Sequence, residues 1–211
     1  MPGVGLITTT HDLKDAARQP LAAERTAIIV VDIQEKLLPP IFEKERLIRN
    51  AKLLLRLASV LKLPVLATTQ YAKGLGQTVP EIAGLLPAPN SATPQVLDKL
   101  EFGCFGNEAF CGALRKLGRE RDALLVCGME THICILQTAL GALRDGYAVH
   151  VAADACGSRP AMGEEKGLNW RLGLERMRDA GAVISSTEMA IYELLRGSGT
   201  TEFKEMLQHL K

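Results

Sequence analysis

The chain has 211 residues, of which 47% are apolar and 23% charged, a composition typical of a globular protein and not of a disordered or fibrous one. Its 25 basic and 24 acidic residues nearly cancel, so net charge gives no reason to expect binding to nucleic acid or to a membrane surface. Small molecules and other proteins remain as partners. A chain of this length is expected to bury about 70% of the surface that the unfolded chain exposes, so it can fold without disulfides or metal ions.

The N-terminal residues lack a basic segment followed by an apolar one, and we therefore expect no secretory signal. No apolar run approaches the roughly 20 residues that a membrane span requires, so no membrane partner is expected. The cysteines are odd in number and include no CxxC pair, which indicates a reducing compartment and predicts a cytoplasmic location. They are Cys104, Cys111, Cys127, Cys134 and Cys156.

Predicted strands and helices alternate along the chain. Residues 26–33 are an apolar run ending near Asp32, which is typical of a parallel strand buried on both faces. A helix is expected over 41–61, and a second strand over 65–70. Residues 71–94 are rich in Gly and Pro and predict a long connection with room for one short helix. The pattern then predicts strands at 95–99, 123–129, 147–155 and 182–186 and helices at 107–118, 131–145, 163–180, 187–196 and 201–210.

This regular alternation predicts an α/β fold, a single doubly wound, Rossmann-like, mostly parallel sheet with helices on both faces. Ser185 and Glu188 have the spacing of a capping box for the helix at 187–196. No segment is long enough to act as a linker between domains. We expect an N-terminal extension over residues 1–24 and one domain over 25–211.

Polar residues at strand ends are the candidates for chemistry, because ligands of such sheets bind beyond the carboxyl ends of the strands. Asp32 closes the first predicted strand, Lys99 closes the third, and Cys134 lies in the first turn of the helix after the fourth. The helix N-terminus and Lys99 are both expected to favour the Cys134 thiolate. A thiolate beside an acid that carries a proton can attack a carbonyl and then protonate the leaving group.

Other interpretations of these residues remain open. The carboxylate of Asp32 can cap a neighbouring loop, and a single cysteine beside a helix is more often a small buried hydrophobe than a nucleophile. Cys104, five residues past Lys99, is a rival nucleophile, whereas the other three cysteines are expected in the core. The sequence has no glycine-rich phosphate loop and no histidine pair with ligand spacing, so we expect no cofactor and no metal.

Three motifs in register resemble the isochorismatase-like cysteine hydrolase family. They are IIVVDIQ (28–34), DKLEFGCF (98–105) and GMETHICILQTAL (128–140), and the resemblance extends from about residue 26 to residue 196. Two further segments, TTQYAKGLGQTVPEI (68–82) and EFKEMLQHLK (202–211), are most similar to the isochorismatase domain-containing subgroup, whose physiological substrates are largely undefined.

The resemblance implies a catalytic triad. Cys134 matches the family nucleophile, Asp32 the residue that accepts its proton and hands it on, and Lys99 the cation that holds the other two. The family also has a non-proline cis peptide bond before the nucleophile, which here would join Met129 to Glu130. The resemblance also implies that the backbone N–H groups of Glu130 and Cys134 form the oxyanion hole.

Departures from related branches narrow the expected activity. The nicotinamidase branch carries histidines for a metal beside the loop that follows the first strand, and here QEKLLPP follows Ile33 without one. Isochorismatases proper cleave a vinyl ether without needing the cysteine, so Cys134 favours acyl chemistry. Residues expected in the substrate pocket by position are Gln34, Gln70, Tyr71, Phe102 and Phe105, although each of them can equally serve packing or loop structure.

The sequence thus predicts a cysteine hydrolase, an amidohydrolase that acts on a small amide or related acyl substrate through a thioester. The alternatives are a non-catalytic small-ligand-binding or scaffold protein with the same fold, and a thiol-based redox role for Cys134 or Cys104. We expect a homo-oligomer, a dimer or larger, with a small-molecule substrate whose identity the sequence does not specify.

Overall fold

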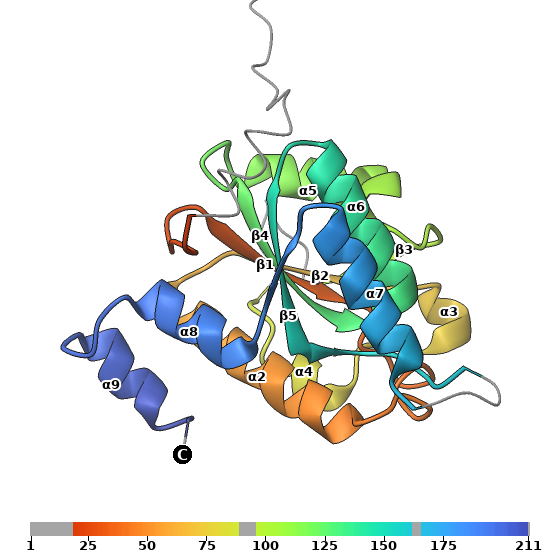
Figure 1. Ribbon diagram of the computed structural model, residues 1–211, viewed down its shortest axis with the longest axis horizontal. Helices are drawn as coiled ribbons and strands as arrows, with labels where there is room; N and C mark the ends of the chain where they lie inside the picture. Colours follow the sequence, from red (N-terminus) through yellow and green to blue (C-terminus); the bar gives the residue numbers. More distant parts are fainter. Residues whose placement is uncertain (1–18, 89–95, 162–165, 211) are drawn as a thin grey trace, which may run out of the picture.

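The computed structural model of the protein describes residues 19–88, 96–161 and 166–210. They form a six-stranded parallel sheet in the order β3-β2-β1-β4-β5-β6, with helices on both faces (Figure 1). The doubly wound α/β fold predicted from the sequence is therefore confirmed. The strands are β1 (Thr26–Val31), β2 (Val65–Gln70), β3 (Leu97–Lys99), β4 (Ala123–Met129), β5 (Ala148–Gly157) and β6 (Val183–Ser185).

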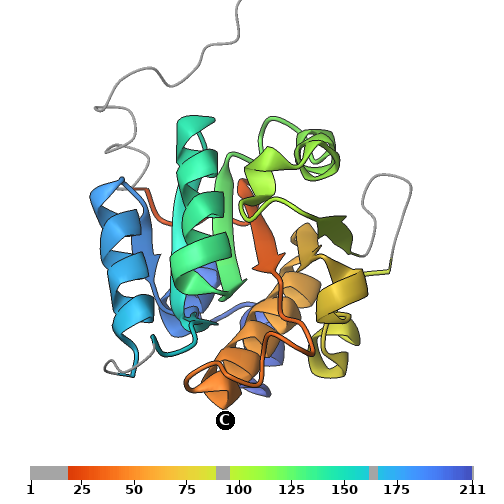
Figure 2. The ribbon, with the colours of Figure 1, turned by 90° about the vertical axis from the view of Figure 1, so that its right-hand side faces the viewer.

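The helices form two layers (Figure 1). One layer holds α2 (Lys44–Leu61), α4 (Pro80–Ala83), α8 (Thr187–Leu195) and α9 (Thr201–Leu207). The other holds α5 (Glu108–Lys116), α6 (Leu136–Arg144) and α7 (Leu168–Asp179), with α6 and α7 side by side (Figure 2). Three short elements complete the described chain: α3 (Ala72–Leu75), the 3₁₀ turn η1 (Cys104–Gly106) and the π-helical turn η2 (Thr131–Ile135).

Side chains of the central strands alternate between two cores. Ile28 and Val30 of β1 pack with α2 and α8, whereas Ala27, Ile29 and Val31 pack with α5, α6 and α7. All five are at most 1% exposed, which explains why this strand is a continuous apolar run and not an alternating one. The covered sheet leaves only the strand ends for polar chemistry.

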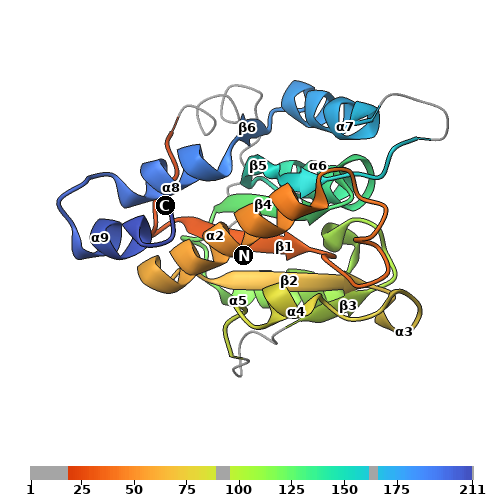
Figure 3. The same ribbon diagram turned by 90° about the horizontal axis from the view of Figure 1, so that it is seen from below.

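The two ends of the described chain meet on α8. The backbone N–H of Leu21 donates to the Glu193 carboxylate at 2.9 Å, and the Leu21 side chain is buried in the core. Part of the predicted N-terminal extension therefore packs with the domain, while residues 1–18 lie outside the described residues. Helix α9 lies beside α8 (Figure 3), where the rings of Tyr192 and Phe203 are 6.3 Å apart. No helix in the described part of the chain is long and apolar enough to span a membrane.

Most differences from the predicted elements are at their ends. The predicted Ser185 cap is wrong, because Ser185 is still paired in β6 with Ala152. The N-cap of α8 is Ser186, whose hydroxyl accepts from the Met189 backbone N–H at 3.1 Å. The long connection contains two short helices instead of one, and the predicted helix over 131–145 begins with a π turn. Parts of the predicted elements at 71–94, 95–99 and 163–180 lie outside the described residues.

The sheet changes winding direction between β1 and β4. The chain leaves β1 toward β2 on one side, and leaves β4 toward β5 on the other. In such sheets the loops after the two strands separate and leave a crevice for ligands. Gly128 lets β4 and β1 approach closely here, because it has a φ of 122° and a Cβ at this position would lie 2.1 Å from the Val31 carbonyl oxygen.

We expect Gly128→Ala to be severely destabilising for two reasons. The positive φ of this residue is unfavourable for alanine, and the added Cβ would clash with the backbone of β1. Gly146→Ala is the matched control, since Gly146 also has a positive φ but a Cβ there would meet nothing within 4 Å. The control should lose about 1–2 kcal/mol of unfolding free energy, and Gly128→Ala should lose more than about 4 kcal/mol. Denaturant unfolding measures both, and equal losses would contradict the close approach.

Candidate active site

Asp32 and Lys99 form a buried ion pair at the carboxyl edge of the sheet. The Lys99 Nζ lies 2.6 Å from the Asp32 Oδ2, and the two residues are 2% and 0% exposed. Asp32 directly follows β1 with a φ of 51°, a left-handed conformation that aspartate tolerates better than most residues. This turn ends the strand two residues earlier than the apolar run predicts.

The ammonium group of Lys99 has three acceptors for its three protons. Besides Asp32, it donates to the Gln70 side-chain oxygen at 2.8 Å and to the Phe102 carbonyl at 3.1 Å. A charged lysine has no acceptor site of its own. Lys99 is thus suited to holding charge and position, and not to accepting a proton.

Cys134 belongs to η2, the π-helical turn between β4 and α6. The wide turn is closed by a hydrogen bond from the Ile135 N–H to the Glu130 carbonyl at 3.1 Å. Cys134 is 7% exposed, and its thiol lies near enough to Asp32 for the carboxylate to raise the thiol pKa. The structure therefore brings Asp32, Lys99 and Cys134 together, from three strand ends far apart in the sequence.

The expectation of a low thiol pKa is wrong for the resting site. The pKa of the Cys134 thiol is raised to about 12, first because the thiol is buried and next because Asp32 is negatively charged. Lys99 and the Glu130 backbone favour the thiolate but are outweighed. The sequence shows the helix start and the lysine, but not how deeply the sulfur is buried beside a carboxylate.

The turn that carries Cys134 is held by contacts with the loop after β5 and with α7. The peptide bond between Met129 and Glu130 is cis, where the family resemblance places one. The buried Glu130 carboxylate accepts from the Arg159 backbone N–H at 2.9 Å and pairs with its guanidinium at 3.2 Å. Helix α7 approaches through Gly173, where a Cβ would lie 3.0 Å from the Thr131 carbonyl oxygen. Sequence reasoning missed these contacts because residues flanking different strands make them.

Cys104 is the less accessible of the two candidate nucleophiles. It is 0% exposed, and burial raises its thiol pKa to about 11. Its sulfur lies 3.9 Å from the Thr68 hydroxyl, and its backbone N–H donates to the Thr138 hydroxyl at 3.0 Å. Among the remaining cysteines, Cys127 and Cys156 are buried as predicted, whereas Cys111 is only half-buried.

The five residues expected in the pocket differ in availability. Gln34 is not available to a substrate, because backbone groups already use its side-chain amide. The amide nitrogen donates to the Gln70 and Gly76 carbonyls, and the amide oxygen accepts from the Gln70 N–H. The Gln70 amide donates to the Leu100 carbonyl at 2.8 Å while its oxygen holds Lys99. The exposed side chains are those of Tyr71 and Phe102, 47% and 54% exposed. Phe105 packs against Phe110 and Tyr147 at ring distances of 5.6 and 5.7 Å.

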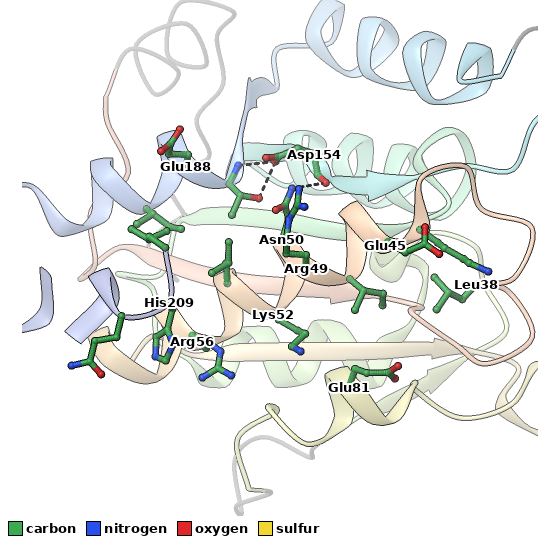
Figure 4. Close-up of a pocket in the computed structure, with 17 residues that line it drawn as sticks. Leu38, Glu45, Arg49, Asn50, Lys52, Arg56, Glu81, Asp154, Glu188 and His209 are labelled. Carbon is green, nitrogen blue, oxygen red and sulfur yellow. Dashed lines mark hydrogen bonds between the residues drawn. The ribbon is translucent and has the colours of Figure 1, made fainter. Parts of the chain in front are cut away.

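Two cavities lie outside the triad. A groove of about 420 Å³ between η1 and α6 is lined by both Phe102 and Phe105. A larger cavity of about 810 Å³ lies on the outer side of α2, between α8 and the C-terminal residues (Figure 4). Its charges balance, so it offers no net attraction for an anion or a cation. Its charged lining residues are Lys44, Arg49, Lys52, Arg56, Glu45, Glu81, Asp154 and Glu188.

Histidines do not add metal ligands to the triad. Within residues 19–88, 96–161 and 166–210, no three His, Cys, Asp or Glu side chains are grouped so that they could hold a metal ion. His132, which belongs to η2 itself, instead lies 3.0 Å from the Ser158 hydroxyl, and burial lowers its imidazole pKa.

Comparison with protein families identifies the fold and the site region together. The isochorismatase domain matches residues 26–189, which contain the ion pair and the π turn. The chain belongs to the isochorismatase family. This family membership makes it a hydrolase-like protein and agrees with the resemblance found in the sequence.

Relatives with curated descriptions match nearly the whole chain. A secreted isochorismatase effector, Isc1 of Phytophthora sojae (strain P6497), is 35% identical over 90% of this chain and 87% of its own. Isochorismatase domain-containing protein 2A of Mus musculus is 36% identical over 89% of this chain and 84% of its own.

Solved structures share the fold. MAR1 ribonuclease from Caenorhabditis elegans has a TM-score of 0.79 and 31% identity, covering 91% of this chain and 92% of its own. YcaC from Pseudomonas aeruginosa, with hexane-2,5-diol and covalent acrylamide, has a TM-score of 0.79, 26% identity and the same coverage. YcaC from Escherichia coli, described as an octameric hydrolase of unknown specificity, has a TM-score of 0.79 and 25% identity, covering 90% of each chain.

We expect Asp32→Asn to make Cys134 easier to alkylate. The carboxylate raises the thiol pKa, so removing its charge should lower that pKa and increase the thiolate fraction at neutral pH. Each unit by which the pKa falls gives about ten times more thiolate, and a corresponding gain in iodoacetamide labelling at Cys134. Mass spectrometry measures the labelling rate, and thermal melting confirms that the variant is folded. Slower labelling of a folded variant would contradict the effect assigned to Asp32.

Proposed function

We propose that this protein is a metal-independent cysteine hydrolase that acts on a small amide or related acyl substrate. The observation that carries the proposal is the buried Asp32 carboxylate, which pairs with the Lys99 ammonium and lies near enough to the Cys134 thiol to raise its pKa. In this mechanism the Cys134 sulfur attacks the substrate carbonyl and forms a thioester. Asp32 takes the thiol proton and delivers it to the departing amine.

The second half of the reaction returns the enzyme to its starting state. Water attacks the thioester carbonyl, Asp32 accepts a proton from that water, and the acid product leaves. The proton on Asp32 then returns to the Cys134 sulfur. Lys99 stays charged throughout, because each of its three protons has an acceptor in the resting site.

The raised thiol pKa supports this division of roles. A thiol with a pKa of about 12 is protonated at neutral pH, so its proton must leave as the sulfur attacks. The adjacent carboxylate can accept it in the same step. We assign the oxyanion hole to the backbone N–H groups of Glu130 and Cys134, and the Glu130 backbone already favours negative charge on the sulfur.

Substrate contacts are proposed at the exposed edge of the site. Tyr71 and Phe102 offer aromatic surface there, with Gln70 behind them and Phe105 beside the groove between η1 and α6. The YcaC structure from Pseudomonas aeruginosa holds covalent acrylamide, which supports a reactive group in a protein of the same fold.

We further propose a cytoplasmic location and assembly with copies of the same chain. The octameric YcaC from Escherichia coli supports self-assembly in this fold. The relative from Phytophthora sojae is described as secreted, so location differs between proteins this similar. A ribonuclease, the description of the neighbour from Caenorhabditis elegans, is the second candidate function, although the balanced charge of this chain gives RNA no electrostatic attraction.

Pre-steady-state kinetics should separate a hydrolase from a binding protein. With a small p-nitroanilide whose thioester hydrolyses more slowly than it forms, the wild type should release a burst of amine equal to the enzyme concentration, because acylation consumes one Cys134 per molecule. Cys134→Ala should show no burst and no turnover, while Cys111→Ala, which changes a half-buried cysteine outside the triad, should retain both. Hydrolysis by Cys134→Ala would disprove the mechanism. Across a panel of small amides, binding without release would indicate a binding protein, and cleavage of RNA alone would favour a ribonuclease.

Chelation should leave the activity unchanged. The proposed mechanism obtains its nucleophile from Cys134 and its oxyanion donors from backbone N–H groups, so no step needs a metal ion. Exhaustive dialysis against EDTA, followed by the same amide assay, tests this. Loss of activity on dialysis with recovery on addition of zinc or iron would show that a metal takes part.

A further inference from the structure

We propose that Thr68 is the positioning residue for Asp32, and that the buried Cys104 thiol orients Thr68 in turn. The Thr68 hydroxyl donates to the Asp32 Oδ1 at 2.7 Å, while Lys99 donates to the Oδ2 at 2.6 Å. Each carboxylate oxygen therefore has one short, fixed donor. The proposed role in turnover rests on the hydrolase function above, but the effect on the Cys134 thiol does not.

The direction of the hydrogen bonds follows from counting protons. Thr68 has one hydroxyl proton, and that proton is directed to Asp32. In the 3.9 Å contact between the Thr68 oxygen and the Cys104 sulfur, the thiol must then be the donor. Burial raises the pKa of Cys104 to about 11, so its thiol holds a proton to donate at neutral pH. The chain of donors runs from Cys104 through Thr68 to Asp32.

Strand β2 holds Asp32 through its backbone as well. The Asp32 N–H donates to the Thr68 carbonyl at 3.1 Å, so one residue binds the aspartate at two points. Thr68, Asp32 and Cys104 are each at most 2% exposed. The contact between the Thr68 hydroxyl and Asp32 is therefore shielded from bulk solvent, and on loss of the hydroxyl the freed oxygen must find another donor or rotate.

A further donor beside the carboxylate is the Cys134 thiol, whose pKa the Asp32 charge raises. Without the Thr68 hydroxyl, the Oδ1 becomes an additional acceptor for that thiol. This stabilises the protonated sulfur, so the Cys134 pKa should rise further. The predicted shift is opposite in sign to that of Asp32→Asn, which removes the acceptor charge.

The adjacent residue provides a matched control. Thr69 is as buried as Thr68, at 2% exposure, but its hydroxyl donates at 2.9 Å to Asp98, a residue outside the triad. Thr68→Val and Thr69→Val remove the same group from the same strand. Only the first removes a contact to Asp32.

The experiment compares Thr68→Val, Thr68→Ser and Thr69→Val by iodoacetamide labelling of Cys134 across neutral to alkaline pH. Thr68→Val should label at least about threefold more slowly at each pH, which corresponds to about half a pKa unit upward. Its kcat for the amide substrate should fall about tenfold or more with KM little changed. Thr68→Ser, which restores a hydroxyl, and Thr69→Val should both resemble the wild type. Cys104→Ala should shift labelling in the same direction as Thr68→Val, by less.

The outcomes distinguish positioning from packing. Wild-type labelling by a folded Thr68→Val variant, or an equal change in Thr69→Val, would overturn the proposal. Failure of Thr68→Ser to restore labelling would show that the hydroxyl is not the group responsible, and wild-type labelling by Cys104→Ala would remove Cys104 from the chain. If the wild type hydrolyses no amide, the proposed function fails, while the labelling rates still decide the role of Thr68.

Discussion

The buried ion pair between Asp32 and Lys99 is the interaction on which the rest of the site depends. Moving two charges out of water is costly, and their attraction compensates only when the remaining hydrogen-bonding positions are also satisfied. Here they are: Lys99 has three acceptors, and each oxygen of Asp32 has a donor. The pair fixes a negative charge beside Cys134, and this charge adds to the effect of burial in keeping the thiol protonated.

The fold supplies this pair by bringing three strand ends to one edge of the sheet. The change of winding direction between β1 and β4 sends the chain after them to opposite faces of the sheet, and Asp32 and Cys134 lie at the start of these two connections. Lys99 reaches them from β3, two strands from β1, and Gln70 at the end of β2 fills the space between. A parallel sheet is well suited to this, because all its carboxyl ends meet at one edge.

Tight packing keeps η2, the turn that carries Cys134, in place. Gly128 and Gly173 allow β1 and α7 to approach the backbone on either side of the turn more closely than a side chain would permit. The Glu130 carboxylate is held by Arg159 on the next strand's loop. The cavity on the outer side of α2, although larger, has balanced charge and no contact with this arrangement (Figure 4). Size alone therefore does not identify the reactive site of this protein.

Local sequence determined the elements and the candidate reacting groups. The apolar runs predict the central strands closely because both faces of the sheet are buried, and the motifs around Asp32, Lys99 and Cys134 indicate the triad. Tertiary structure decided what those groups can do. The Cys134 pKa depends on burial and on a carboxylate that is 102 positions away in the chain (134 − 32). Gln34, expected in the pocket, is instead used by the backbone of β2, and Thr68 carries no signal in the sequence. Hydrogen bonds between distant strand ends exist only once the sheet has formed, so no local pattern encodes them.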